Sequence, residues 1–263
     1  ALMALAELSA IQGAGKEEVA KLLTKAVEAN PTEVAPRLLL IELHLRSNDS
    51  KLALTAAQSA VSAVPASPEL LDALGRAQQA SGDLNQAANT FAKLIEAQPL
   101  SPSAHLRLAA VQLASKNKES AEKSLRKALE IKPDFLEAQR SLIVLNTEAK
   151  RFADAIAIAR EVQKQRPKAA VGLMFEGDIL GAQKDWEAAA AAYQAGLKVV
   201  DASELAVKLH GAITQSGKVA DADRFAATWL KSHPKDIRFM FYSGETAMAR
   251  KDYAAAETQY LAI

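Results

Sequence analysis

The sequence lacks cysteine and has few aromatic residues and almost no net charge. Without cysteine the chain forms no disulfide and offers no thiolate nucleophile, a composition compatible with either the cytosol or the periplasm. Its 32 Lys and Arg against 31 Asp and Glu leave a net charge of +1, so charge alone attracts it neither to nucleic acid nor to an anionic membrane. No segment predicts a membrane span. The apolar opening 1–11 contains Glu7 and keeps helical spacing, so we expect a helix there.

What the sequence does contain is a regular series of prolines. Five of them follow one another at intervals of 34 residues, and a sixth continues the series after a place that Asp201 occupies. They are Pro31, Pro65, Pro99, Pro133, Pro167 and Pro234. The other three, Pro36, Pro68 and Pro102, stand just inside the expected start of a following helix, where a missing N–H costs nothing. The series therefore predicts helix boundaries that recur with this period.

Small residues recur in the same register. The stretch 73–99 shows apolar residues at helical spacing on both sides of Gly82-Asp83, which predicts two amphipathic helices joined by a tight turn. Alignment on the prolines brings one alanine of the second helix into register in seven units, at Ala53, Ala87, Ala121, Ala155, Ala189, Ala222 and Ala256. A small side chain there predicts close contact between the two helices, because a larger one would force them apart. Gly75, Gly177, Gly211 and Gly244 recur in the first helix and indicate the same closeness.

A helix-turn-helix unit of 34 residues with this pattern resembles the tetratricopeptide repeat. The resemblance implies an all-α fold, a right-handed α-α superhelix in which helical hairpins stack into a solenoid. We expect a single array over 1–263, with repeats at 1–33, 34–67, 68–101, 102–135, 136–169, 170–203, 204–236 and an incomplete one at 237–263. The repeat at 204–236 has one residue fewer, which we expect near its inter-helix turn. The missing initiator Met and the apolar end 260–263 predict that the array is part of a longer chain.

Four segments carry a narrower resemblance. PRLLLIELHLRSND (36–49), GLMFEGDIL (172–180), AAAYQAGL (190–197) and ATWLKSHPKD (227–236) are similar to segments of the tetratricopeptide putative lipoproteins that accompany PEP-CTERM protein sorting and exopolysaccharide production in Gram-negative bacteria. The resemblance implies a location in the bacterial envelope, in the periplasm and anchored to the outer membrane through a lipidated cysteine upstream. A cytoplasmic location is the alternative.

No pattern of catalytic or ligating residues is found. None of the four histidines has a second His or a Cys at metal-ligand spacing. On the repeat register His105 and His210 fall at packing positions. Gly13-Ala14-Gly15-Lys16 lacks the earlier glycine and the following Ser or Thr of a phosphate-binding loop. We therefore predict no enzymatic activity, no cofactor and no metal.

The family geometry places first helices on the concave surface, and this implies which residues line a groove for a partner. In the amino-terminal half they are Glu69, Asp72, Arg76, Gln79, Arg107 and Arg140. In the carboxy-terminal half they are Met174, Phe175, Asp178, Lys208, Arg238, Phe241, Tyr242 and Glu245. Such a mixture suits a peptide held by apolar anchors and a few charged contacts. For Phe175, Phe241 and Tyr242, packing between repeats is an equal alternative.

Two ligand modes of tetratricopeptide arrays are missing from these positions. The carboxylate clamp needs a Lys and an Asn one turn apart. One turn after Arg140 stands Val144, and one turn after Lys208 stands Ala212. The asparagine ladder needs Asn in successive repeats, and the equivalent positions hold other residues. We expect a noncatalytic scaffold that binds a protein or peptide in its groove, in envelope protein sorting or exopolysaccharide production. The alternatives are a recruiting or regulatory arm of an enzyme whose catalytic domain lies outside this sequence, and a module that binds polysaccharide.

Overall fold

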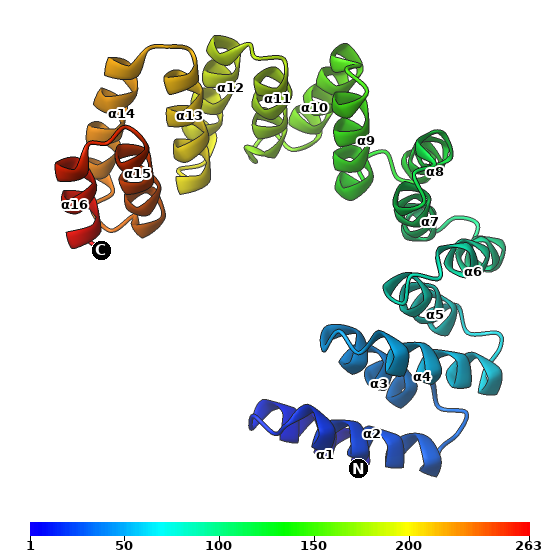
Figure 1. The fold of residues 1–263 in the computed structure, drawn as a ribbon. Coiled ribbons are helices and arrows are strands. Elements are labelled where there is room, and N and C mark those ends of the chain that lie inside the picture. The colour runs from blue at the N-terminus through cyan, green and yellow to red at the C-terminus, as the bar shows by residue number, and fades with distance from the viewer. The chain divides into compact units, whose positions relative to one another are not determined.

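The computed structural model describes all residues 1–263 and contains sixteen α-helices and no strand (Figure 1). The helices are α1 (Leu2–Ile11), α2 (Lys16–Ala29), α3 (Val34–Arg46), α4 (Ser50–Ala63), α5 (Pro68–Ala80), α6 (Leu84–Ala97), α7 (Pro102–Ala114), α8 (Lys118–Ile131), α9 (Leu136–Glu148), α10 (Phe152–Gln165), α11 (Val171–Ala182), α12 (Trp186–Val199), α13 (Ser203–Gln215), α14 (Val219–Ser232), α15 (Ile237–Ala249) and α16 (Tyr253–Leu261). The expected all-α class is confirmed. None of these helices is long and apolar enough to cross a bilayer.

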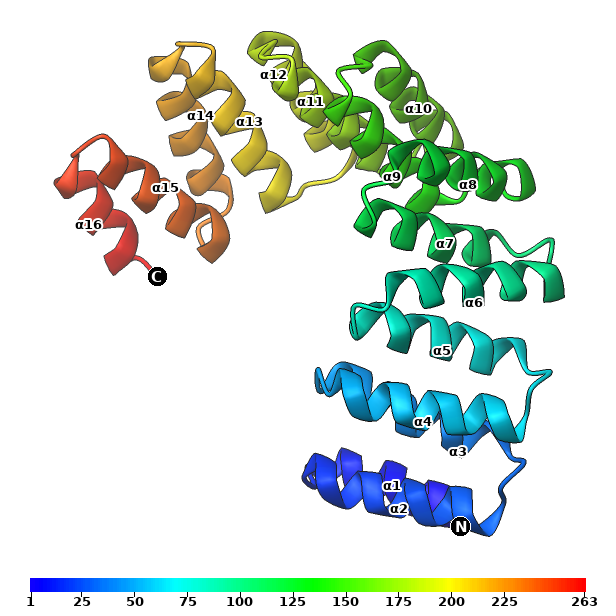
Figure 2. The same ribbon diagram turned by 45° about the vertical axis from the view of Figure 1, so that its right-hand side comes forward.

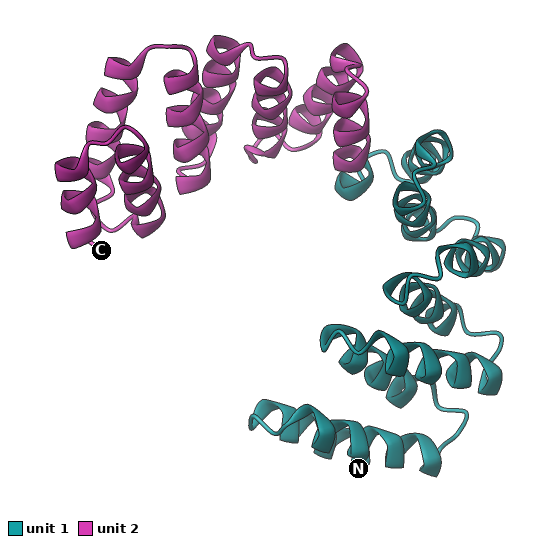
Figure 3. Ribbon diagram, viewed as in Figure 1, with its two compact units in different colours: residues 1–138 teal, residues 139–263 magenta.

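The chain divides into two compact units, which are described separately (Figure 3). Unit 1 comprises Ala1–Ala138 and contains α1 to α8, and unit 2 comprises Gln139–Ile263 and contains most of α9 and all of α10 to α16. Within each unit consecutive helices pack as antiparallel hairpins, and the hairpins stack side by side (Figures 1 and 2). The first helices of neighbouring hairpins also touch, as α3 touches α5 and α13 touches α15.

The alanine of the second helix is buried in every hairpin where the sequence placed it. The seven side chains from Ala53 to Ala256 are all 0–1% exposed. A larger residue at such a fully buried position would force the two helices apart. The register predicted from the proline series is therefore confirmed.

At a second contact within the hairpins, a glycine of the first helix packs against a large ring of the second helix. A Cβ added to Gly75 would lie 2.5 Å from the ring of Phe91, and the same clash would arise between Gly244 and Tyr260 at 2.7 Å. Gly177 stands against Tyr193 in the same way. The glycines are therefore needed because a large ring from the second helix occupies the space of their side chain.

Where the first helix carries a larger residue, the second carries a smaller one. Ile41 and Ile143 in the glycine register are buried, and the residues sixteen positions later are the buried Ala57 and Ala159. Gly211 is the exception among the glycines, since a Cβ there would meet only the Tyr242 hydroxyl, at an ordinary 3.5 Å. The expectation of close approach is thus correct for three of the four glycines and wrong for Gly211.

Each inter-helix turn contains one residue in the left-handed region. Glycine occupies it at Gly13, Gly82 and Gly217, with φ of 80° to 84°. Elsewhere a side chain is forced into it, with φ of 57° to 64° at Asn48, Lys116, Lys150, Lys184 and Lys251. A non-glycine residue costs about 1 kcal/mol or more in this region, so these five turns are held by the packing of the helices on either side.

Only some of the helix starts are stabilised by a side-chain cap. Ser67 and Ser101 cap α5 and α7, where their hydroxyls accept hydrogen bonds from the backbone N–H of Leu70 and Ala104. Asp83 directly precedes α6 and makes no such bond.

The shortened repeat loses its residue at a different place from the one expected. The turn between α13 and α14 has the full length, with Gly217 in the left-handed region. The connection between α12 and α13 has three residues, Val200 to Ala202, whereas those before α5, α7 and α9 have four. The omission therefore lies at the junction of two repeats, because the hairpin itself must keep its register to bury Ala222.

Candidate functional site

The predicted groove residues of unit 1 form a chain of ion pairs instead of a row of free charges. Arg76 of α5 pairs with Glu42 of α3, and its other terminal nitrogen lies 3.8 Å from Asp72. Asp72 in turn accepts a hydrogen bond from Nε of Arg107 of α7 at 2.9 Å. The pairs join residues 34 and 35 positions apart, so they connect three successive repeats.

The two other predicted residues of unit 1 have separate surroundings. Glu69 is exposed and accepts a hydrogen bond from the Ser67 hydroxyl at 2.7 Å, which lowers the pKa of its carboxyl and ties it to the cap of α5. Gln79 is half-buried. Five of the six residues assigned to the amino-terminal half thus lie in unit 1, and Arg140, which is exposed, belongs to unit 2.

In unit 2 the structure separates the predicted apolar anchors. Phe175 is only 7% exposed and belongs to the core, so its expected role as a groove anchor is wrong and the packing alternative is correct. Met174 is half-buried against the cluster around Tyr193 and Leu205. Phe241 is 52% exposed, with its ring 5.9 Å from that of Tyr260. Arg238 is exposed at the first turn of α15.

Three predicted residues of unit 2, Lys208, Tyr242 and Glu245, meet in one pocket. The pocket has a volume of about 510 Å³ and lies among α12, α13 and α15. The complete lining is Trp186, Tyr193, Lys208, Gly211, Ala212, Thr214, Gln215, Tyr242, Glu245, Thr246 and Ala249. Its size falls in the range of sites that bind small molecules or short peptide segments, and we call it the α13 pocket.

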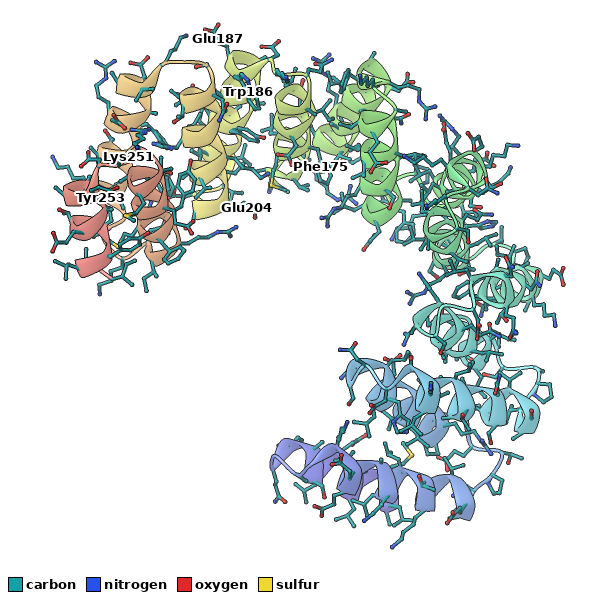
Figure 4. All side chains as sticks on the ribbon, viewed as in Figure 1. Phe175, Trp186, Glu187, Glu204, Lys251 and Tyr253 are labelled. Carbon is teal, nitrogen blue, oxygen red and sulfur yellow. The ribbon has the colours of Figure 1, made fainter.

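Two aromatic residues of the α13 pocket, Trp186 and Tyr193, were not among the predicted groove residues. Trp186 is the first residue of α12, where Figure 4 labels it beside Glu187. Tyr193 follows two turns later and fills the space left by Gly177. The repeat pattern explains both residues as core, and what it did not indicate is that their rings also face a cavity. A sequence search for aromatic residues on a second helix together with polar residues on the first helix of the following repeat would have indicated this pocket.

The charge of Lys208 is neutralised within the protein. Its Nζ lies 2.7 Å from Oδ1 of Asp178, and the same oxygen accepts a hydrogen bond from the Tyr193 hydroxyl at 2.7 Å. Lys208 Nζ also lies 5.8 Å from the centre of the Tyr193 ring. Burial, with this carboxylate beside it, raises the pKa of Tyr193 far above its usual value, so Tyr193 stays a hydrogen-bond donor at every physiological pH.

Tyr242 is held by a buried histidine. Its hydroxyl lies 3.0 Å from Nδ1 of His210, which is 3% exposed. Burial lowers the pKa of His210 and raises that of Tyr242, so both are neutral near pH 7. The predicted packing role of His210 is confirmed. The wall of the pocket that Tyr242 forms is therefore fixed in position before any ligand arrives.

Glu245 is the exposed acid of the α13 pocket, and it has no ion-pair partner. Arg250, the residue that follows α15, pairs with Asp223 at 2.7 Å instead. The pocket thus combines fixed aromatic walls, the neutral Lys208–Asp178 pair and one uncompensated carboxylate.

The comparisons identify the class of repeat. Residues 73–134, 120–170 and 148–204 match the tetratricopeptide repeat model and together span half of the chain. The chain therefore belongs to the tetratricopeptide repeat family. A curated relative is the cellulose synthase operon protein C of Pseudomonas fluorescens (strain SBW25), 32% identical over 92 residues, which are 35% of this chain and 7% of the relative.

Solved structures show the same fold at low sequence identity. One is yeast Tom70, which has 16% sequence identity and a TM-score of 0.66. The match covers 93% of this chain and 54% of the Tom70 chain. A second is a tetratricopeptide repeat protein from Parabacteroides merdae ATCC 43184, with 15% sequence identity and a TM-score of 0.63. This match covers 92% of this chain and 95% of the other. YrrB, described as a TPR protein with an unusual peptide-binding site, matches 73% of this chain with 98% of its own, at 19% identity and a TM-score of 0.51.

Proposed function

We propose that this chain is a noncatalytic scaffold that binds an extended peptide of a partner protein in the α13 pocket. The observation that carries the proposal is the pocket itself, since it gathers aromatic rings, polar side chains and a free carboxylate from α12, α13 and α15. Peptide recognition commonly depends on such aromatic anchors surrounded by a few polar contacts. YrrB, which shares the fold, is described as having a peptide-binding site.

For the biological setting we propose exopolysaccharide production or export in the envelope of a Gram-negative bacterium. The support is the similarity to cellulose synthase operon protein C over 92 residues and the narrower sequence resemblance to lipoproteins of exopolysaccharide systems. A full-length, epitope-tagged protein is expected in the periplasmic or outer-membrane fraction. Recovery in the cytosolic fraction alone would contradict this location.

The binding site is tested by site-specific photo-crosslinking in cells that produce the polymer. A photoreactive amino acid at Gln215, an exposed residue of the α13 pocket, is expected to give a discrete protein adduct that mass spectrometry identifies. The matched control is the same amino acid at Lys231, which is exposed on α14 and does not line the pocket. Equal adducts from both positions, or none from Gln215, would contradict the proposal.

Direct binding of polysaccharide is a second candidate. The rings of Trp186, Tyr193 and Tyr242 stand beside the hydroxyls of Thr214 and Thr246 in the same pocket, and such a surface also suits a sugar ring and its hydroxyl groups. A crosslinked species from Gln215 that contains carbohydrate and no partner protein would favour this candidate over the peptide.

A further inference from the structure

We infer that the α13 pocket recognises a basic side chain, an arginine or lysine of the partner peptide. This inference rests on the proposed function and specifies the chemistry of its ligand. It depends on three observations, namely the sign of the uncompensated charge, the aromatic walls, and the rigidity of the groups around them.

The first observation is the balance of charge. Among the residues that line the pocket, only Lys208 and Glu245 are charged. Lys208 already lies 2.7 Å from Asp178 and stacks its cation near the Tyr193 ring, so it has little remaining attraction for an anionic ligand. Glu245 has no such partner within the chain. The pocket therefore carries one net negative charge, which disfavours an acidic peptide and favours a basic one.

The second observation is the type of wall. Trp186, Tyr193 and Tyr242 line the pocket from α12 and α15. Faces of Trp and Tyr rings attract cations, most strongly where the site is shielded from water. Since Lys208 already lies near the Tyr193 ring, an arginine can stack its planar guanidinium on the ring of Trp186 or Tyr242 while it donates hydrogen bonds to a carboxylate. Carboxylate and aromatic rings are both present here, whereas a purely apolar peptide would leave Glu245 without a partner.

The third observation is that the walls are fixed in advance. The Tyr193 hydroxyl donates to Asp178, and the Tyr242 hydroxyl is joined to the buried His210. Two rings are thus held at both the hydroxyl and the backbone, which reduces the entropy lost on binding. Glu245 is the one exposed charged side chain of the pocket, and it is left to adjust to the incoming cation.

The test begins with selection of random nine-residue peptides, acetylated and amidated at their ends so that only side chains carry charge, against the purified chain. The expected outcome is enrichment of arginine or lysine at one position. The binding of a selected peptide is then compared with that of its citrulline analogue, which keeps the shape of arginine and removes the charge. We expect the citrulline peptide to bind about tenfold more weakly.

The matched variants are Glu245→Gln and Glu257→Gln, the latter changing an exposed acid of α16 in the same unit. Glu245→Gln is expected to weaken the arginine peptide about tenfold and to remove its advantage over citrulline, whereas Glu257→Gln should leave both affinities unchanged. Selected peptides without basic residues, or equal effects of the two variants, would overturn this inference while the proposed function stands. Selection of no peptide at all would overturn both.

Discussion

The packing of glycines against large rings predicts that a change from glycine to alanine has opposite effects on stability at Gly75 and Gly211. Replacing either Gly75 or Gly211 by alanine favours the helix by about 1 kcal/mol, because glycine is the weaker helix former. At Gly211 the added methyl group meets only a hydroxyl at 3.5 Å. We therefore expect Gly211→Ala to stabilise the protein by about 0.5–1 kcal/mol.

At Gly75 the added methyl group would lie 2.5 Å from the ring of Phe91, which is fully buried and cannot turn into solvent. Overpacking of this kind costs about 1–3 kcal/mol. After the gain in helix propensity is subtracted, Gly75→Ala should destabilise the protein by about 1–2 kcal/mol. The second variant, Phe91→Leu, should cost about as much because it leaves a cavity.

The double variant Gly75→Ala, Phe91→Leu recreates the pair that the chain itself uses at Ala109 and Leu125, both fully buried. It should therefore cost less than the two single variants together, with a coupling energy of about 1 kcal/mol. Urea unfolding followed by circular dichroism measures the midpoints, and an unchanged dependence on urea shows that the same surface is exposed. If Gly75→Ala stabilised the protein as Gly211→Ala does, or if the double variant were additive, the volume argument would be refuted.

Three further predictions concern a turn, a helix cap and a histidine. Lys116→Gly should raise the free energy of unfolding by about 0.5–1 kcal/mol because it relieves a left-handed backbone, and thermal unfolding with Gly82→Lys as the reverse change checks it. Ser101→Ala should cost about 1 kcal/mol through the lost cap, whereas Asp83→Ala, which removes no capping bond, should cost less in the same urea assay. Asp201 lies 2.7 Å from Nε2 of His233 and raises the pKa of that imidazole, so Asp201→Asn should lower the pKa in an NMR titration, with Asp221→Asn as a control that leaves it unchanged. Since the folded pKa is raised, the Asp201–His233 pair stabilises the fold below about pH 6.5, and this contribution should disappear as the pH rises through the folded pKa.

The hairpins could be predicted because the same local pattern of prolines, alanines and apolar residues recurs in successive repeats. Pro68 and Pro102 mark the starts of α5 and α7, and the alanine register follows from a contact within one hairpin. The place of the missing residue was predicted wrongly because the prolines mark junctions only where a proline is present, and Asp201 stands at this one. Whether a turn residue such as Lys116 adopts a positive φ depends on the packing of both flanking helices.

The candidate site was less predictable, because it depends on contacts between repeats. Phe175 and Phe241 both fall on first helices, yet Phe175 is 7% and Phe241 52% exposed. Likewise Lys208 is a binding candidate by position, and its pairing with Asp178 arises from the preceding repeat. A search for opposite charges separated by about one repeat length would have found this pair and the Arg76–Glu42 pair as well.

The ion pairs of unit 1 link recognition to the geometry of the stack. Asp72, Arg76 and Arg107 are among the residues predicted to line the groove, and their ion pairs also fasten α3, α5 and α7 to one another. A substitution that changes what this surface attracts would therefore also loosen a junction between repeats. If the predicted groove of unit 1 binds a partner, a change of that partner would therefore also require the ion pairs between its repeats to be rebuilt at another position.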